Sequence, residues 1–272
     1  MRALWLVRDN LETHPGGDTT QILRTKAALE RLGVTVELAR HPGPEPGTYD
    51  VVHLFHLDRL WEHLAVCRRL RAARVPAVLS PIYWPADEFD RGGRAGPQGT
   101  LARVLGSQAY QTIRLMQRFG LRCLRKRTLR GWDRRLLSFQ RAARYLLDAV
   151  SVILPNSVAE LKQIEDLFGD GRPAVVVPNA ADLSMFVQDK CAASAERAGV
   201  LCVGRIEPRK NQLALLGALQ GTGIPLTLVG QPGRFSRRYA RRCRRSAGPH
   251  ARFLGRRSPA ELRKLYRAAR VH

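Results

Sequence analysis

A repeated alternation of short apolar runs with helix-length segments constrains the fold of this protein more than any other feature. Apolar runs that stop at glycine, proline or polar residues predict strands, and the longer segments between them predict helices. Strands that alternate with helices pair in parallel, because each helix returns the backbone to the edge where the next strand begins. The sequence therefore predicts an α/β protein with doubly wound parallel sheets.

The alternation occurs twice, in two Rossmann-like units joined head to tail. We expect the first unit at 1–180, a linker at 181–197 and the second unit at 198–272. The expected strands lie at 3–7, 34–39, 51–57, 76–84, 149–157, 174–180, 200–203, 225–229 and 251–254. The expected helices lie at 19–32, before Arg74, and at 158–168, 210–220, 236–246 and 258–269. Since domains usually run to about 100–150 residues, we expect an incomplete second unit, in a protein that is truncated at its C-terminal end.

The composition indicates a soluble globular protein with a large excess of positive charge. A net charge of +23 suggests an anionic partner, although arginine-rich coding would also produce it, because only six of the 46 basic residues are lysine. Five scattered cysteines without a CxxC pattern argue against a disulfide framework or a metal site and fit a reducing cytosol. No apolar run approaches the roughly 18 residues of a membrane span. We expect a cytoplasmic protein, with any membrane contact peripheral and on the inner face.

The stretch VGRIEPRKN at residues 203–211 places three cations between an expected strand and an expected helix. Ligands of such sheets bind beyond the carboxyl ends of the strands, and helix N-termini there favour phosphate. Arg205 could supply a bidentate guanidinium and Lys210 a mobile point charge, which together suit a diphosphate. Gly204 lets the backbone approach such a ligand. The alternative is that Arg205 and Lys210 are surface charges that flank a loop.

A second glycine pair, Gly16 and Gly17, precedes the first helix in HPGGDTTQ. Glycine allows backbone N–H groups to approach a ligand closely. The pair is not a P-loop, because no GKS or GKT follows, and it lacks the full GxGxxG pattern. A plain turn, with Asp18 or Thr19 capping the helix, is the alternative interpretation.

The order of these segments resembles that of the group 1, family-4-type retaining glycosyltransferases. The segments are HPGGDTTQILRTKAALERLGVTVELA, YDVVHLFHL, AVSVILPNSVAELKQIEDLFG, AVVVPNAADLSMF, VGRIEPRKNQLALLGAL and ARFLGRRSPAELRKLYRAARV. The resemblance implies a GT-B architecture, an acceptor-side first domain and a second domain that binds a UDP- or GDP-linked sugar. It also implies that Arg205 and Lys210 hold the donor diphosphate, and that Gly16, Gly17, Tyr83 and Gly204 line the cleft, without a cofactor.

The protein departs from the family pattern in two places. The E-x7-E motif, whose carboxylates contact the donor in the family, would lie beyond residue 272, and the x7 spacing of Glu37 and Glu45 is attributed to chance. The histidine that often follows the fourth strand is absent, and Tyr83 lies in its neighbourhood, with His53 and His56 on the preceding strand as further candidates. The catalytic residues therefore stay unknown, and little or no transferase activity is expected of these 272 residues alone.

Residues of about 90–147 interrupt the alternation with a basic helical insertion. Residues 114–147 hold eleven basic residues with leucines and aromatic residues between them. A basic amphipathic helix pair can lie on an anionic membrane, which would suit a lipid-linked acceptor. A solvated flap is the alternative, and binding to nucleic acid is not favoured.

Three functions are consistent with these features. The first is a hexosyltransferase that acts with retention on a polysaccharide or lipid-linked acceptor and needs no protein nucleophile. Its main demand is then to stabilise the charge of the departing diphosphate. The second is a catalytically silent protein that binds a nucleotide-sugar or a membrane surface. The third is a module that binds nucleic acid or a membrane by charge alone.

Overall fold

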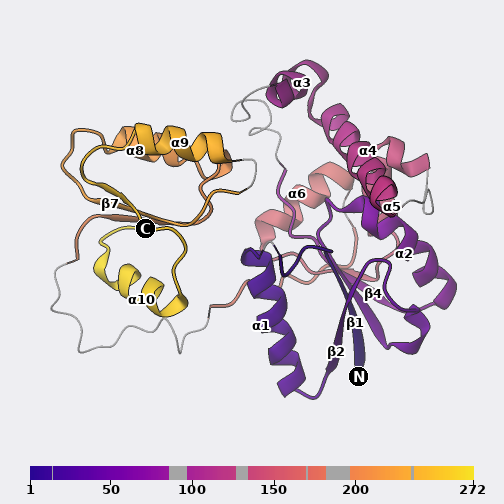
Figure 1. Ribbon diagram of the computed structural model, residues 1–272. Coiled ribbons are helices and arrows are strands. Elements are labelled where there is room, and N and C mark those ends of the chain that lie inside the picture. Colours follow the sequence, from indigo (N-terminus) through magenta and orange to yellow (C-terminus); the bar gives the residue numbers. More distant parts are fainter. Residues whose placement is uncertain (14, 86–96, 127–133, 170, 182–196, 234–235) are drawn as a thin grey trace. The chain divides into compact units, whose positions relative to one another are not determined.

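The computed structural model describes the protein except for residues 14, 86–96, 127–133, 170, 182–196 and 234–235 (Figure 1). It divides into two compact units, Met1–Ala180 (unit 1) and Ala181–His272 (unit 2). Residues 182–196 of the expected linker and part of the expected insertion lie outside the described residues.

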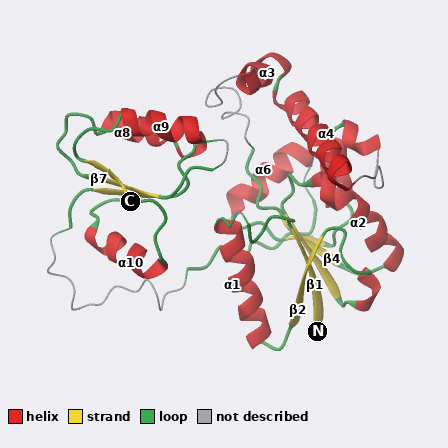
Figure 2. Ribbon diagram, in the orientation of Figure 1, coloured by secondary structure: helices red, strands yellow, loops and turns green. Residues whose placement is uncertain are grey.

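Unit 1 is built on a five-stranded parallel sheet in the order β2-β1-β3-β4-β5 (Figure 2). Its strands are β1 (Arg2–Val7), β2 (Thr35–Arg40), β3 (Val51–Phe55), β4 (Ala77–Ser80) and β5 (Val152–Ile153). The last two are shorter than the expected 76–84 and 149–157, and prolines follow both, at 81 and 155, where no backbone N–H can continue the ladder. In place of an expected strand at 174–180, Ala174 forms an isolated parallel bridge with Ile153.

Alternate residues of β1 serve two separate apolar cores, because successive side chains of a strand point to opposite faces of the sheet. Trp5 and Val7 pack with Ile22 of α1 (Gly17–Arg31) on one face. Leu4 and Leu6 belong to the larger core on the other face. That face is covered by α2 (Leu60–Ala73), α4 (Ser107–Lys126), α5 (Phe139–Leu147) and α6 (Val158–Phe168).

The helical insertion contributes to the larger core and is not a fully solvated flap. It contains α3 (Pro97–Leu105), α4, a 3-10 turn at Arg134–Leu137, and α5. Leu115 and Phe119 of α4 and Leu136 of the 3-10 turn are buried in the same core as the sheet. The spacing of four residues between Leu115 and Phe119 places both on the helix face that packs inward.

Unit 2 contains a three-stranded parallel sheet, β6-β7-β8, formed by β6 (Val200–Val203), β7 (Leu226–Val229) and β8 (Ala251–Phe253). Helices α8 (Gln212–Ala218) and α9 (Arg237–Arg245) lie on one face and α10 (Pro259–Ala268) on the other (Figure 1). The helix expected at 210–220 begins only at Gln212, because Pro208–Lys210 form a 3-10 turn and Asn211 takes a left-handed conformation, with φ of 52°. Val271 forms a parallel bridge with Val200 at the free edge of β6.

Candidate functional site

A polar cluster occupies the carboxyl edge of the unit 1 sheet, where ligands of parallel α/β sheets bind. Arg8 follows β1 directly and is 8% exposed. Its Nε donates to Asp18 Oδ2 at 2.6 Å and its Nη2 donates to Thr19 Oγ1 at 2.9 Å. Its Nη1 donates to the backbone oxygen of Asn10 at 2.8 Å. The guanidinium therefore ties the end of β1 to the first turn of α1.

His56 joins this cluster from the neighbouring strand. It is the first residue after β3, and its backbone has a φ of 71°, a conformation that residues other than glycine rarely adopt. Its Nε2 lies 3.2 Å from Asp18 Oδ2. Burial alone raises the pKa of Asp18, but the contacts with His56 and Arg8 outweigh burial and lower that pKa well below its usual range. Asp18 is therefore held as a carboxylate between two basic groups.

The two glycines singled out from the sequence flank this cluster in different ways. Gly16 donates its backbone N–H to Thr19 Oγ1 at 3.1 Å, and a Cβ at Gly16 would lie 2.7 Å from Asp18 Oδ1. The absence of a side chain at Gly16 thus leaves room for the Asp18 carboxylate to reach Arg8. Gly17 is exposed, and a Cβ there would meet no atom within 4 Å. Their predicted role beside a ligand stays a prediction.

Among the described residues of unit 1, three histidines are buried. His53 Nε2 lies 2.9 Å from Ser80 Oγ, and its ring stacks on Phe55 with centroids 4.1 Å apart. His63 Nε2 lies 3.0 Å from the backbone oxygens of both Phe55 and His56. Burial lowers the pKa of His53 to about 3 and that of His63 to about 4. Burial also lowers the pKa of His41, whose ring contacts that of His63 edge to face.

Tyr83, whose predicted place beside a cleft stays a prediction, is buried in the core of unit 1. It is 7% exposed, and its ring packs against Phe139 and Phe168 at centroid distances of 6.4 and 6.0 Å. Its backbone N–H donates to the buried carboxylate of Glu160 at 2.6 Å, and Asn156 N donates to the same carboxylate at 2.7 Å. The expected strand at 76–84 ends at Ser80, so the residues after it turn inward and bring the ring into the core.

Each strand of the unit 2 sheet ends one or two residues before a glycine with positive φ. Gly204 follows β6 and Gly230 follows β7, with φ of 155° and 145°, and Gly255 comes soon after β8 with φ of 61°. Gly230 N donates to Gly255 O at 2.8 Å, and a Cβ at Gly230 would lie 2.0 Å from Gly204 O. At the carboxyl edge of this sheet the backbone segments therefore pack closely, and because these glycines carry no side chains, a ligand can approach the backbone.

Arg205 and Lys210 both lie in the loop between β6 and α8, at this glycine edge. The Lys210 Cε lies 3.7 Å from the position of a Cβ on Gly204, so the lysine side chain extends over the end of β6. The Arg205 side chain is 61% exposed, with its Nε 3.6 Å from Glu207 Oε2. In the part of unit 2 that the structure describes, Lys210 has no carboxylate within ion-pair distance. Gln212 Nε2 donates to Arg205 O at 2.9 Å and fixes the loop to α8.

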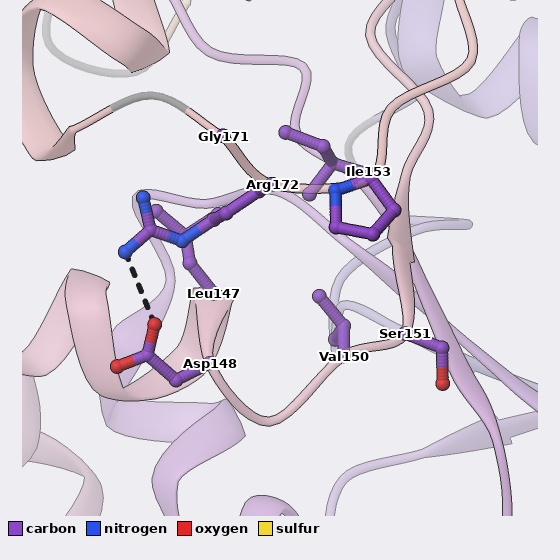
Figure 3. A pocket seen from close by; sticks show the side chains of 8 residues that line it. Leu147, Asp148, Val150, Ser151, Ile153, Gly171 and Arg172 are labelled. Carbon is purple, nitrogen blue, oxygen red and sulfur yellow. Dashed lines mark hydrogen bonds and ion pairs between the residues drawn. The ribbon is translucent and has the colours of Figure 1, made fainter.

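Unit 1 also contains a hollow of about 300 Å³, and Figure 3 shows the side chains that line it. It is lined by residues that precede β5, among them Val150 and Ser151, and therefore lies at the amino edge of the sheet. Arg172 borders it and donates to Asp148 Oδ1 at 3.0 Å and to Gly169 O at 2.7 Å. Because ligands of parallel α/β sheets bind at the opposite edge, we assign this hollow no ligand.

The pair Glu37 and Glu45 has structural partners. Tyr49 donates its hydroxyl to Glu37 Oε2 at 2.7 Å, and Arg69 lies 3.1 Å from Glu45 Oε1. Across the described ranges, no group of three or more His, Cys, Asp or Glu residues is placed to hold a metal ion. No helix within those same ranges is long and apolar enough to cross a membrane.

Sequence reasoning missed the cluster of Arg8, Asp18 and His56. Arg8 and His56 follow two strands, β1 and β3, that are neighbours in the sheet but lie far apart in the sequence, and Asp18 lies in the first turn of α1. A usable signal existed, since Arg8 and His56 are the first polar residues after the apolar runs ALWLV and VVHLF. Charged groups at the ends of adjacent parallel strands meet at one edge of the sheet.

Two parallel α/β units in sequence, each with its polar or glycine-rich loops at the carboxyl edge, define a GT-B-like fold. Solved structures with this fold match the protein over its whole length. Anabaena Alr3699/HepE in complex with UDP matches with a TM-score of 0.62 and 16% identity, over 100% of this chain and 73% of that one. The same protein in complex with UDP-glucose matches with a TM-score of 0.61 and 17% identity over the same shares.

The lipopolysaccharide outer core galactosyltransferase WaaB, in its apo form, matches with a TM-score of 0.50 and 12% identity, over 99% of this chain and 72% of that one. At these identities the likeness concerns the fold, and the expected α/β, GT-B-like class is confirmed. No protein-family model and no curated protein matches the sequence.

Proposed function

We propose that this chain belongs to a glycosyltransferase that takes a hexose from a UDP- or GDP-linked sugar and passes it to a sugar or lipid-linked acceptor with retention. The observation that carries the proposal is the bare glycine edge of unit 2 with Lys210 over Gly204 and Arg205 in the same loop. It is supported by the fold, which matches a protein solved with UDP-glucose across the full length of this one.

In this proposal the cations at the glycine edge bind the donor diphosphate and stabilise it as it leaves. The bond from the sugar C1 to the diphosphate oxygen breaks, and the acceptor oxygen bonds to C1 on the face that the diphosphate vacates. The acceptor proton passes to the departing diphosphate. Negative charge grows on the diphosphate in this step, so a guanidinium and an ammonium placed beforehand lower the barrier. No protein nucleophile is required.

Unit 1 provides the acceptor side in this proposal, and the protein is cytoplasmic with a peripheral contact to the inner face of the membrane. The outward face of α4 supports the membrane contact, because Met116, Leu121 and Leu124 are 40%, 59% and 75% exposed on it. Arginines flank this face, and anionic lipid headgroups attract them.

The test is titration of UDP, GDP and UDP-glucose into the protein by isothermal calorimetry. Replacing both cations, in Arg205→Ala/Lys210→Ala, should weaken nucleotide affinity by about tenfold or more, because each charge-assisted hydrogen bond to a phosphate contributes about 1.5–3 kcal/mol. The matched control is Arg241→Ala/Arg245→Ala, which removes the same charge from the exposed side of α9. Equal loss in both variants, or no nucleotide binding by the wild type, would contradict the proposal.

A catalytically silent nucleotide-sugar-binding protein is the alternative, and release of UDP or GDP distinguishes it. Donor sugar incubated with the protein and candidate acceptors should yield free nucleotide if the protein is an enzyme. Nucleotide binding that depends on Arg205 and Lys210, without release above the buffer rate over the acceptors tried, would favour the silent protein.

A further inference from the structure

Four arginines from two elements converge beside the first turn of α2. Arg114, Arg118 and Arg122 follow one another at intervals of four along α4 and therefore share one face of it. The Arg118 guanidinium lies 5.8 Å from the centroid of the Trp61 ring, and that of Arg59 lies 5.1 Å from the same centroid. These four residues, Arg59, Arg114, Arg118 and Arg122, are called the arginine cluster below.

The carboxylate within the cluster does not neutralise it. Glu62 is 3% exposed and accepts from Arg59, with Nε 2.7 Å from Oε2. The same carboxylate lies 4.0 Å from Arg122 Nη1, which is buried without a hydrogen-bond acceptor. Among the described residues, neither Arg114 nor Arg118 has a carboxylate within ion-pair distance. The pKa of Arg118 is lowered by burial and by the positive charges of Arg114 and Arg59, and the carboxylates of Asp58 and Glu62 offset this only in part.

The cluster is continuous with the carboxyl edge of the unit 1 sheet. Arg59 follows the turn after β3, and its backbone N–H donates to His56 O at 3.2 Å. His56 in turn contacts Asp18 in the polar cluster after β1. Arg118 is desolvated on its protein side only and keeps an exposed surface, so the cluster is open to solvent. Guanidinium groups present paired N–H donors whose geometry matches phosphate oxygens, and they remain charged when crowded.

We propose that the arginine cluster binds a phosphate or diphosphate group of the molecule that receives the sugar. The inference rests on the proposed function, and it narrows the acceptor to one that carries phosphate near its reacting hydroxyl. An anion at this position would accept from Arg114 and Arg118 and would supply the acceptor that Arg122 Nη1 lacks. The phosphate could belong to a lipid headgroup or to a soluble phosphorylated sugar, which share this chemistry.

The test uses the full-length protein in the Arg205→Ala/Lys210→Ala background, so that the proposed donor site does not contribute. Pyrophosphate titrated by calorimetry should still bind saturably. Adding Arg118→Ala/Arg122→Ala should weaken that binding by about tenfold or more. Adding Arg141→Ala/Arg144→Ala, two exposed arginines of α5, should change it by less than about twofold, because distant exposed charges are screened. Arg118→Lys/Arg122→Lys should give an intermediate affinity, since it keeps the charge and loses the paired donors.

Equal effects of the two alanine pairs, or no saturable pyrophosphate binding in the background variant, would overturn the site. Neither result touches the donor proposal, which depends on UDP binding by the wild-type protein. If Arg118→Ala/Arg122→Ala lowers the urea midpoint of unfolding, the test uses Arg118→Lys/Arg122→Lys in its place. Pyrophosphate affinity that is unchanged in the lysine variant then argues against the site.

Sedimentation with phosphatidylglycerol–phosphatidylcholine vesicles tells a lipid phosphate from the phosphate of a soluble acceptor. If Arg118→Ala/Arg122→Ala binds the vesicles more weakly and Arg141→Ala/Arg144→Ala does not, the phosphate belongs to a lipid. If vesicle binding is unchanged in both variants, the phosphate belongs to a soluble acceptor.

Discussion

Asp18 is the residue on which the polar cluster of unit 1 depends, because two basic side chains from different strands point at one carboxylate. Arg8 holds it at 2.6 Å and His56 lies 3.2 Å from it, while Gly16 leaves the space in which it sits. Without this carboxylate, the nearly buried Arg8 guanidinium would keep only its contacts with Thr19 and Asn10 among the partners described above. The shape of the loop between β1 and α1 should therefore depend on the charge at residue 18.

Asp18→Asn should destabilise the protein at neutral pH by about 1–3 kcal/mol, because a buried arginine loses its ionic partner. The pKa of Asp18 is lowered on folding, so its contribution is complete above the ordinary carboxyl value of 3.8 and is lost as the pH falls below it. The difference in urea unfolding free energy between wild type and variant should shrink accordingly in acid.

The matched control for this prediction is Asp148→Asn. Asp148 also pairs with an arginine, at 3.0 Å, but its side chain is 55% exposed. Exposed pairs contribute about 0–1 kcal/mol. If Asp148→Asn lowers the unfolding free energy as much as Asp18→Asn does, the burial of the cluster has no energetic consequence.

At the scale of elements, the junction of β6 and β7 depends on a close backbone approach. Gly230→Ala would put a Cβ 2.0 Å from Gly204 O at a φ of 145°, so the two strand ends must separate. We expect a loss of about 1–3 kcal/mol in unfolding free energy together with weaker UDP binding, because the loop with Lys210 shifts. Gly233→Ala, where a Cβ meets nothing within 4 Å, should change neither quantity. If Gly230→Ala destabilises the protein but leaves UDP affinity unchanged, the nucleotide does not bind at this edge.

The outward face of α4 allows the membrane contact to be tested on its own. Leu121→Asp/Leu124→Asp removes two exposed leucines and should reduce sedimentation with phosphatidylglycerol-containing vesicles by several-fold, since the burial of each leucine contributes about 1.5–3 kcal/mol. Leu32→Asp/Val158→Asp makes the same charge change at side chains that are 79% and 72% exposed. If both pairs reduce binding equally, the contact follows net charge and not the α4 face.

For the whole molecule, the net charge of +23 and the binding of nucleotides should be separable by salt. A single-stranded RNA oligonucleotide bound through phosphate contacts alone should lose affinity steeply, by about 300-fold or more between about 50 and 200 mM salt if six or more phosphates are neutralised. UDP, with fewer charges, should lose much less. Fluorescence anisotropy of labelled RNA measures the first affinity and calorimetry the second. RNA binding that resists salt and is displaced by UDP would support a nucleic-acid function instead.

The sequence predicted most elements because local signals decide them. The helix at 158–168 ends at Gly169, as expected, and the strand at 200–203 agrees residue for residue. The expected helix at 210–220 began too early because the left-handed conformation of Asn211 leaves no trace in apolar periodicity. The strand expected at 76–84 was too long because its apolar run continues beyond Ser80, and only packing shows that the Tyr83 ring turns inward.

The sites were less predictable than the elements. Gly204, Arg205 and Lys210 share one short loop, so their proximity could be inferred from spacing. The contact between Asp18 and His56 depends instead on β1 and β3 being neighbours in the sheet, and that of Arg122 with Glu62 depends on how α4 packs on α2. Neither arrangement can be inferred from the spacing of residues in the sequence.

Because of its buried histidines, unit 1 should unfold in acid while unit 2 stays folded. A pKa lowered on folding means that stability is complete above the ordinary value of 6.5 and declines as the pH drops towards the folded value. At about pH 5 His53 and His63 should each cost about 2 kcal/mol, a large share of a typical stability of about 5–15 kcal/mol. All four tryptophans lie in this unit, so their fluorescence should report its melting below neutral pH, while circular dichroism still records the helices of unit 2.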